Sequence, residues 1–305
     1  MKRMFKHNYI TLINIFIFNK IMKSKTVLKK PPLPFNGNKK NWFKYFQQAF
    51  KDDLFNIKDN TIIIDLFGGS GILSHWFAHQ YPHNKIIYND YDNYMSIYTS
   101  DNINKLNELL NKIRNIIISK GIKKAEKIDD TTEIFELIKQ YYQNYEENYK
   151  ISNLLTANLC YNNGKLHIKT QLFNKVIKEN YEYNENYIIN QKNIQIIHED
   201  YKNVIEQFKD NNNIFYILDP PYLATEKCYY NDFWGIDNNI DVIRLLMFNK
   251  CIIFESDKSQ ILSLLKLLKE YVDFDYITTD LKNFINRNSK NKEYAIISNI
   301  NKNNN

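Results

Sequence analysis

An acid, two prolines and a tyrosine stand together at residues 219–222, directly after an apolar run at 214–218. The chain has only six prolines, so two adjacent prolines at this point indicate that the backbone needs the conformation that proline imposes. Proline fixes φ and carries no N–H, so this turn is stiff and presents acceptors: the Asp219 carboxylate and the Pro220 carbonyl. Tyr222 adds a flat ring. The set suits an exocyclic amino group on a planar base, whose protons need acceptors and whose face can stack. A strand-ending turn with a packed tyrosine is the alternative interpretation.

Three of the seven glycines, Gly68, Gly69 and Gly71, follow a β-branched run at 61–65 in the stretch DLFGGSG. Glycine permits positive φ and a close approach of the backbone to a ligand, and a following helix directs N–H groups at the loop. No Lys-Ser or Lys-Thr pair ends the loop, so a diphosphate ligand is disfavoured. By itself such a turn is a weak sign of a cofactor.

Asp90 ends a second apolar run at 85–90, about 20 residues beyond the glycines. An acid at that place can accept hydrogen bonds from both ribose hydroxyls of an adenosine. A solvated acid at a strand end is the alternative. The position after the glycine turn favours ribose binding.

These residues need a sheet to position them. The strands that precede the glycines and Asp219 are expected to lie side by side, because open parallel sheets bind ligands beyond the carboxyl ends of their strands. We predict an α/β, three-layer Rossmann-like fold with a mostly parallel seven-stranded sheet and a largely helical inserted subdomain. Helices are predicted at 72–80 and 259–271. The predicted strands are 61–65, 85–90, 193–200, 214–219, 250–256, 273–279 and 293–300.

Residues 101–191 break the alternation of strand and helix. Leucine and isoleucine recur at helical spacing from Asp101 to about Lys150. Tyrosine- and asparagine-rich sequence follows, with an Asn-Gly hairpin signal in the stretch 160–166. We interpret 101–191 as an insert and as the candidate recognition region.

The remaining boundaries follow from this division. Residues 29–100 and 192–300 are expected to form one domain around the insert, with a disordered tail at 301–305. The apolar stretch at 10–18 is too short to span a membrane. Residues 1–28 are expected to lie outside the fold, with translation from Met22 favoured over a weak signal-like segment.

Composition adds two constraints. A formal net charge of +7 favours a polyanionic partner, although a merely lysine-rich proteome explains the charge equally well. The basic loop at 282–294 is equally consistent with contacts to DNA phosphates or with exposure to solvent. Three widely spaced cysteines indicate neither a disulfide framework nor a zinc site and fit a reducing cytoplasm. Three histidines at four-residue spacing, His75, His79 and His83, lack an acid or a cysteine to complete a set, so no metal is expected.

The motifs DPPY, DLFGGSG and NDYDN, with the upstream PPLPFNGNKKNWF, together resemble the DNA adenine N6-methyltransferases of the adenine-methylase type. The resemblance runs from residue 31 to residue 299, although the insert aligns poorly. It implies S-adenosyl-L-methionine as the cofactor and a base flipped out of duplex DNA. DPPY alone also resembles amino-methyltransferases that act on RNA, and the related NPPY acts on protein glutamine. An RNA adenine N6-methyltransferase and a non-catalytic DNA-binding module are the alternatives kept.

The resemblance implies a role for each matching residue. The residues implied to touch the cofactor near its methionyl carboxylate are Phe35, Gly37 and Lys39. The residues implied to shape the cofactor pocket are Asp65, Phe67, Gly68, Gly69 and Gly71. Asp90 is implied to hold the ribose, and Asp200 to lie near the adenine of the cofactor. Those implied to hold the flipped adenine are Asp219, Pro220, Pro221 and Tyr222. The amino nitrogen then attacks the sulfonium methyl group in line, with no covalent intermediate.

Double-stranded DNA is thus the expected partner, and no membrane is expected. A cognate restriction endonuclease is a candidate partner, and no obligate protein partner is evident. The expected location is the cytoplasm.

Overall fold

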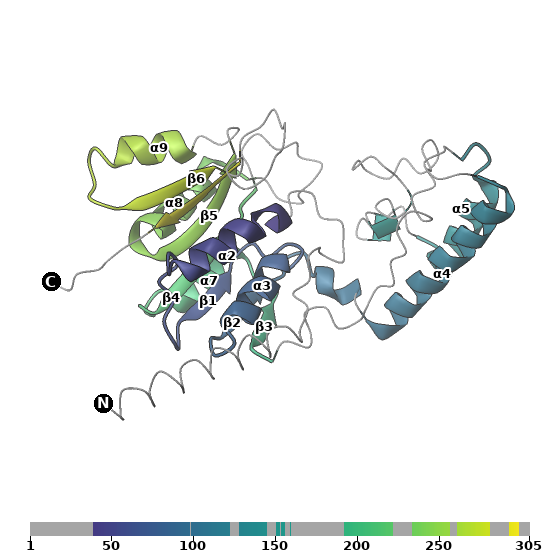
Figure 1. Cartoon of the computed structure of the whole chain (residues 1–305), viewed down its shortest axis with the longest axis horizontal. Helices are drawn as coiled ribbons and strands as arrows, with labels where there is room; N and C mark the ends of the chain where they lie inside the picture. The colour runs from purple at the N-terminus through teal and green to yellow at the C-terminus, as the bar shows by residue number, and fades with distance from the viewer. Residues whose placement is uncertain are drawn as a thin grey trace, which may run out of the picture.

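The computed structural model describes residues 39–97, 99–122, 128–144, 151–152, 154–155, 159, 192–221, 234–256, 261–280 and 293–298. Within these residues seven strands form one sheet (Figure 1). In chain order they are β1 Ile62–Asp65, β2 Ile86–Asn89, β3 Ile194–Ile197, β4 Ile214–Leu218, β5 Lys250–Ser256, β6 Tyr276–Asp280 and β7 Glu293–Ser298. Each predicted strand overlaps an observed one, and the predicted α/β fold class is confirmed.

The strand order is β3-β2-β1-β4-β5-β7-β6. Strands β1 to β5 pair in parallel, and β7 runs antiparallel to both β5 and β6. At the centre, Ile64 of β1 pairs with Ile87 of β2 on one side and with Tyr216 of β4 on the other. The chain runs outward from β1 to β3 and then returns to β4, so the order reverses between β1 and β4. Ligands bind at such a reversal in open parallel sheets.

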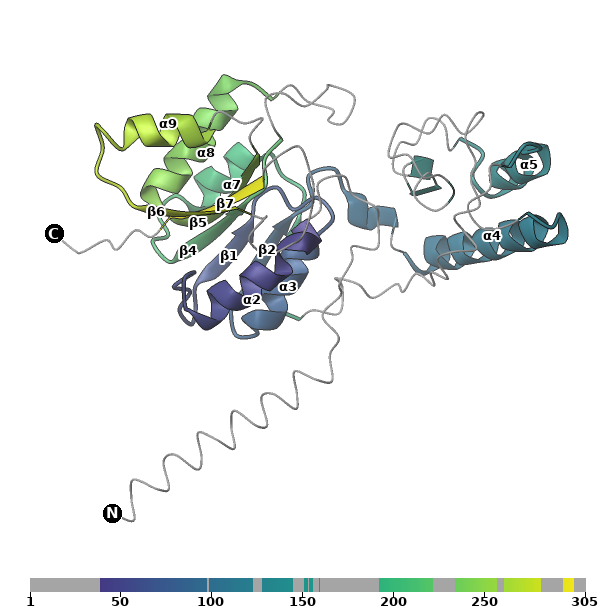
Figure 2. The same cartoon turned by 45° about the horizontal axis from the view of Figure 1, so that its top comes forward.

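Helices cover both faces of the sheet (Figure 2). The helices α2 (Phe43–Lys51) and α3 (Ile72–Gln80) lie on one face, with the 3-10 helix η1 (Lys39–Trp42) leading into α2. The opposite face carries α7 (Tyr201–Phe208), α8 (Ile236–Phe248) and α9 (Ile261–Leu268). The prediction at 72–80 matches α3, and α9 lies inside the prediction at 259–271. Among the helices described, none combines the length and the apolarity that a membrane crossing requires.

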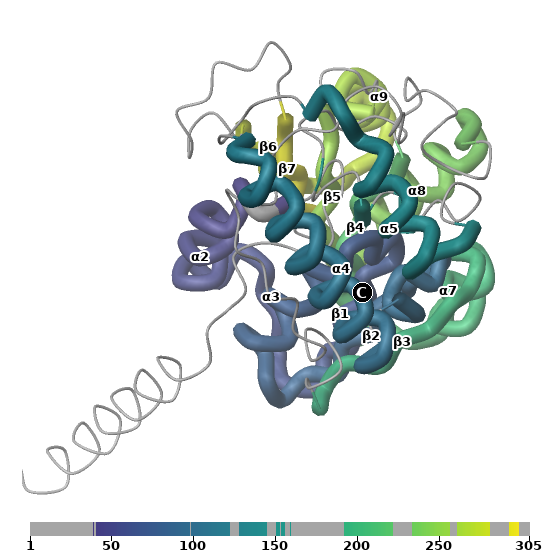
Figure 3. Tube along the Cα trace, turned by 90° about the vertical axis from the view of Figure 1, so that its right-hand side faces the viewer, coloured from purple at the N-terminus to yellow at the C-terminus, as the bar shows by residue number. Residues whose placement is uncertain are grey.

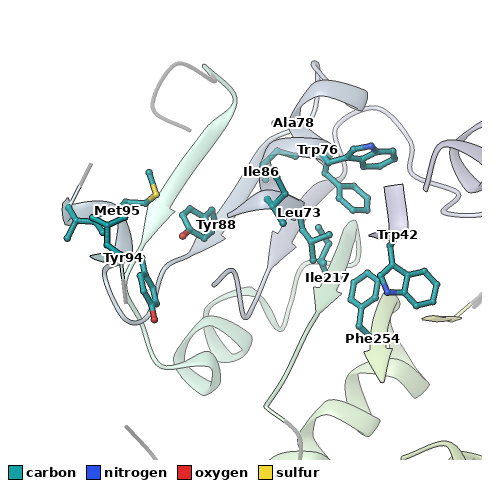
Figure 4. Packing of buried hydrophobic residues seen from close by; sticks show 14 of the residues in the cluster. Trp42, Leu73, Trp76, Ala78, Ile86, Tyr88, Tyr94, Met95, Ile217 and Phe254 are labelled. Carbon is teal, nitrogen blue, oxygen red and sulfur yellow. The ribbon is translucent and has the colours of Figure 1, made fainter. Parts of the chain in front are cut away.

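Alternate residues of the central strands build two cores, because successive strand side chains point to opposite faces. Phe215 and Ile217 of β4 pack on the α2 and α3 side, in one cluster with Trp42 and Phe254. The ring centres of Trp42 and Phe254 are 5.8 Å apart in an edge-to-face arrangement. Figure 4 shows the two side chains next to one another. Tyr216 and its alternate neighbours on β4 pack on the α7 and α8 side. The first core fixes η1 against the end of β5.

Between β2 and β3 the chain forms the 3-10 helix η2 (Tyr94–Ile97) and the helices α4 (Ser100–Ser119) and α5 (Thr132–Tyr141). Figures 1 and 2 show α4 and α5 standing to one side of the sheet, and Figure 3 looks from that side. Thr99 caps α4 by accepting from the N–H of Asn102. The predicted Asn-Gly turn at 160–166 lies outside the described residues, and the predicted domain boundaries stay a prediction.

Candidate active site at the carboxyl ends of β1 and β4

The glycine turn and the proline turn leave adjacent strands at the same edge of the sheet. Asp65 ends β1 opposite Ile217 of β4, and the N–H of Leu66 donates to the carbonyl oxygen of Ile217 at 3.1 Å. Asp219 follows β4 directly. Because the two strands are parallel, both acids emerge at their carboxyl ends, as the sequence predicts.

Asp219 is held by a cation from the start of the described chain. The Nζ of Lys39 lies 2.5 Å from Oδ1 and 2.6 Å from Oδ2 of Asp219. The Lys39 side chain is only 6% exposed, against 22% for Asp219, and its Nζ also lies 5.5 Å from the ring centre of Phe254. Burial raises the pKa of Asp219, Lys39 opposes that rise, and the nearby charge of Glu293 adds to it. Lys39 thus contacts the acid that follows β4 directly.

Asp65 is fully buried, and its Oδ2 accepts from the N–H of Ser74 at 3.1 Å and from its Oγ at 2.7 Å. Its other oxygen, Oδ1, is buried with no hydrogen-bond partner among the described residues. Burial raises the pKa of Asp65 to about 7, with hydrogen bonds from Ser74 opposing and Asp219 contributing. A buried acceptor of this kind fits a cationic ligand, which would favour the ionised carboxylate.

The glycine loop between β1 and α3 needs its glycines for two reasons. Gly69 and Gly71 have φ of 48° and 69°, in the left-handed region. A Cβ on Gly68 would lie 2.2 Å from ring atoms of Tyr88 and 2.9 Å from the carbonyl oxygen of Asn89. The Tyr88 hydroxyl donates to the carbonyl oxygen of Gly69 at 2.8 Å, which ties the loop to β2. The loop is therefore packed tightly against β2.

The structure gives Asp90 a task that the sequence does not reveal. Its carboxylate is buried and accepts from the N–H groups of Tyr94 at 2.8 Å and Met95 at 2.7 Å, which holds the start of η2. Asp200 is exposed and caps α7 by accepting from the N–H of Lys202 at 2.8 Å. Both acids lie at the same sheet edge as Asp65. Their predicted contacts with the ribose and adenine stay predictions.

Sequence reasoning missed an aromatic cluster beside the loop. The ring of Phe67 lies 5.4 Å from those of Tyr201 and Trp234, which are 5.6 Å from each other. The Tyr201 hydroxyl donates to Asp241 and accepts from Asn238 of α8. An aromatic residue directly after Asp200 was the available signal, whereas nothing near Trp234 marked it. The cluster gives this edge an apolar wall.

Three of the predicted site residues are not described by the structure. Phe35, Gly37 and Tyr222 are outside the described residues, so their predicted roles stay predictions. Pro220 is buried and Pro221 half-buried directly after Asp219. Within the described part of the chain, no three His, Cys, Asp or Glu side chains are grouped to hold a metal ion.

A sheet of this order, with a glycine loop after β1 and an acid and two prolines after β4, defines a Rossmann-like methyltransferase. The chain belongs to the D12 class N6 adenine-specific DNA methyltransferase family, whose family model matches residues 35–266. A curated relative from Haemophilus influenzae, named "Putative methyltransferase", is 29% identical over 262 residues, which cover 83% of this chain and 85% of the relative. The family assigns methylation of adenine in DNA as the class of activity.

Proposed function

We propose that the chain transfers a methyl group from S-adenosylmethionine to the N6 amino group of a flipped adenine in double-stranded DNA. One observation carries the proposal: Asp65 of the glycine turn and Asp219 of the proline turn emerge from adjacent parallel strands, at the reversal of strand order. A cofactor at the first turn and a base at the second would therefore share one edge.

S-adenosylmethionine supplies an electrophilic methyl group on a sulfonium. The residues that would hold it are those of the glycine loop, with Phe67 and its aromatic neighbours as an apolar wall. The buried Oδ1 of Asp65 offers an acceptor to the cationic side of the cofactor. Asp90 and Asp200, at the ends of the next two strands, extend this edge toward the ribose and adenine.

The base would sit at Asp219. The Asp219 carboxylate and the Pro220 carbonyl would accept hydrogen bonds from the two amino N–H groups, which directs the nitrogen lone pair at the methyl carbon. As the N–C bond forms, the C–S bond breaks and the sulfur leaves as a neutral thioether, and the methylated nitrogen then loses one of its protons to water. Alignment of this kind contributes about 7 to 11 kcal/mol to many such reactions. Taking the adenine out of the duplex costs a few kcal/mol, which stacking on Tyr222 partly offsets. The amino group would compete with Lys39 for the Asp219 carboxylate, because Lys39 contacts both of its oxygens.

DNA would be bound through the positive charge of the chain and through the helices between β2 and β3. Lys105 and Lys112 are exposed seven residues apart on α4, over the rings of Tyr142 and Tyr141 respectively, and Lys112 is also paired with Glu108 at 2.8 Å, a partner that a phosphate would replace. Ammonium groups on one helix face suit phosphates. We therefore propose that methylation is site-specific and that the region between β2 and β3 recognises the target sequence. The enzyme would act in the cytoplasm, either alone or together with a restriction endonuclease.

Transfer of labelled methyl groups to DNA and to RNA tests the proposal. The expected result is label on adenine N6 of unmethylated duplex DNA and none on RNA. Asp219→Ala should lower transfer at least about 100-fold, because the amino group loses its acceptor, while cofactor binding persists. Asp273→Ala, an exposed acid on a loop, is the matched control. Label on RNA alone, DNA binding without transfer, or a fully active Asp219→Ala would each overturn the proposal.

A further inference from the structure

Glu293 shares a face of the sheet with Lys39. It begins β7 directly opposite Ser256, the last residue of β5, and Ala295 stands opposite Phe254. Residues opposite one another, and residues two apart along a strand, point to the same face. Phe254 and Ala295 belong to the core under η1 and α2. Glu293 therefore lies on the side of the sheet where the Lys39 ammonium rests over Phe254.

The charges of Glu293 and Asp219 are close enough to interact, since Glu293 raises the pKa of Asp219. Glu293 is half-buried and Ser256 is buried. The charge of Lys39 also lowers the pKa of Asp65. In the strand order β1-β4-β5-β7, Asp65 and Glu293 stand on opposite sides of Asp219. Lys39 thus has one acid on the glycine-loop side and another on the β7 side.

Binding of the target base poses a problem of charge. The amino group would compete with the buried Lys39 for the two oxygens of the Asp219 carboxylate. Parting a buried ion pair without a new partner costs about 3 to 5 kcal/mol. A shift toward Asp65 would bring the ammonium toward the proposed cofactor, whose sulfonium is cationic and whose methionyl carboxylate is the partner that the resemblance implies for Lys39. A shift toward Glu293 would instead pair it with an acid of the chain itself, on the side of Asp219 away from the glycine loop.

We propose that Glu293 is a second station for Lys39: the ammonium moves from Asp219 to Glu293 when the adenine amino group takes its place. The Lys39 ammonium lies over Phe254, and Glu293 stands opposite Ser256, two residues further along β5. Residues two apart along a strand are separated by about 7 Å, a distance that the side chains of Lys39 and Glu293 can together cover. Glu293 then acts as a positioning residue for the base-binding acid. The effect of Glu293 on methyl transfer rests on the proposed function, whereas the movement of Lys39 from Asp219 to Glu293 does not.

Thermal unfolding of wild type, Asp219→Asn, Glu293→Gln and the double variant tests the re-pairing without any assay of activity. Asp219→Asn removes the first station, so Lys39 should pair with Glu293. Glu293→Gln should then lower the melting temperature by about 3 to 6 °C more in the Asp219→Asn background than in wild type. Glu270→Gln, an exposed control on the segment after α9, should act equally in both backgrounds. Adding Lys39→Met should abolish the difference. Equal effects of Glu293→Gln in both backgrounds would overturn the inference.

Kinetics separate this inference from the proposed function. Glu293→Gln should lower kcat/KM for unmethylated DNA about 10-fold and leave the Kd for S-adenosylmethionine unchanged, with partial recovery in Glu293→Asp. If wild type methylates DNA and Glu293→Gln matches it, the second station is wrong. If wild type transfers no methyl group to DNA, the proposed function falls, and the unfolding cycle still decides the re-pairing.

Discussion

Lys39 and Asp219 are 180 positions apart in the chain, yet the lysine Nζ contacts both oxygens of the aspartate. The contact exists because η1 is anchored by Trp42 against Phe254, at the end of the strand next to β4. It places a cation on the acid to which we assign the target base. The state of Asp219 therefore depends on Lys39.

Removal of Lys39 should make methyl transfer depend on pH. Burial raises the pKa of Asp219 and Lys39 holds it down, so Lys39→Met should raise that pKa further. At low pH Asp219 is then protonated and accepts poorly. Acidification should therefore lower the transfer rate of Lys39→Met more steeply than that of wild type. Lys44→Met, an exposed lysine of the adjoining helix α2, is the control. A pH profile identical to wild type would contradict the role of the ion pair.

Asp65 should couple cofactor binding to pH. Its pKa near 7 means that it ionises around neutral pH, and a cationic ligand favours the ionised form. The affinity for S-adenosylmethionine, measured by calorimetry, should therefore rise between about pH 6 and pH 8 in wild type and stay flat in Asp65→Asn. Asp59→Asn, an exposed acid, should follow wild type. A wild-type affinity independent of pH would contradict the assignment.

The same shift should appear in stability. The pKa of Asp65 is 3.8 in its ordinary state and about 7 when folded, so the native protein binds the additional proton between these values. The stabilisation that this proton gives the native state is fully present below about pH 4 and is lost as the pH rises through about 7. The free energy of unfolding of wild type relative to Asp65→Asn should fall by at most about 1.4 kcal/mol per pH unit in this window. Urea unfolding measures it, and a rise with pH would refute the sign.

Gly68→Ala should destabilise the protein by about 1 to 3 kcal/mol, because the new methyl group would meet the Tyr88 ring and the Asn89 carbonyl. It should also weaken cofactor binding, since the loop must shift. Gly121→Ala is the comparison: Gly121 has φ of +67° and open space around it, so it tests backbone strain without a clash. Thermal unfolding that ranks Gly121→Ala as the more damaging change would exclude the tight fit.

Asp90→Ala should lower stability because two buried N–H groups lose their acceptor, at about 1 to 3 kcal/mol each. The predicted ribose contact adds a loss of cofactor affinity in the folded fraction. Calorimetry on the folded variant separates the two effects. Reduced stability with unchanged affinity would leave Asp90 a purely structural residue.

The sheet was predictable because its strands are short runs rich in isoleucine and aromatic residues, and some of them end in an acid or directly precede one, as in IIID before Leu66 and IFYIL before Asp219. Helix α3 follows from the same logic, since the glycine turn marks its start. The ion pair of Lys39 was not predictable, because packing of Trp42 rather than any local pattern brings η1 to β4. The hydrogen bonds of Asp90 to η2 were equally hidden, since an acid at a strand end looks the same whether it holds a ligand or backbone N–H groups.

Strands β2 and β3 are hydrogen-bonded neighbours, with Ile86 opposite Ile194, although the whole stretch from η2 to residue 193 separates them in the chain. Their pairing sets where that stretch departs and returns, whatever its length or composition. A change in the length of that stretch can therefore leave the β2–β3 pairing intact, and with it the places of Asp90 and Asp200 at the carboxyl edge of the sheet.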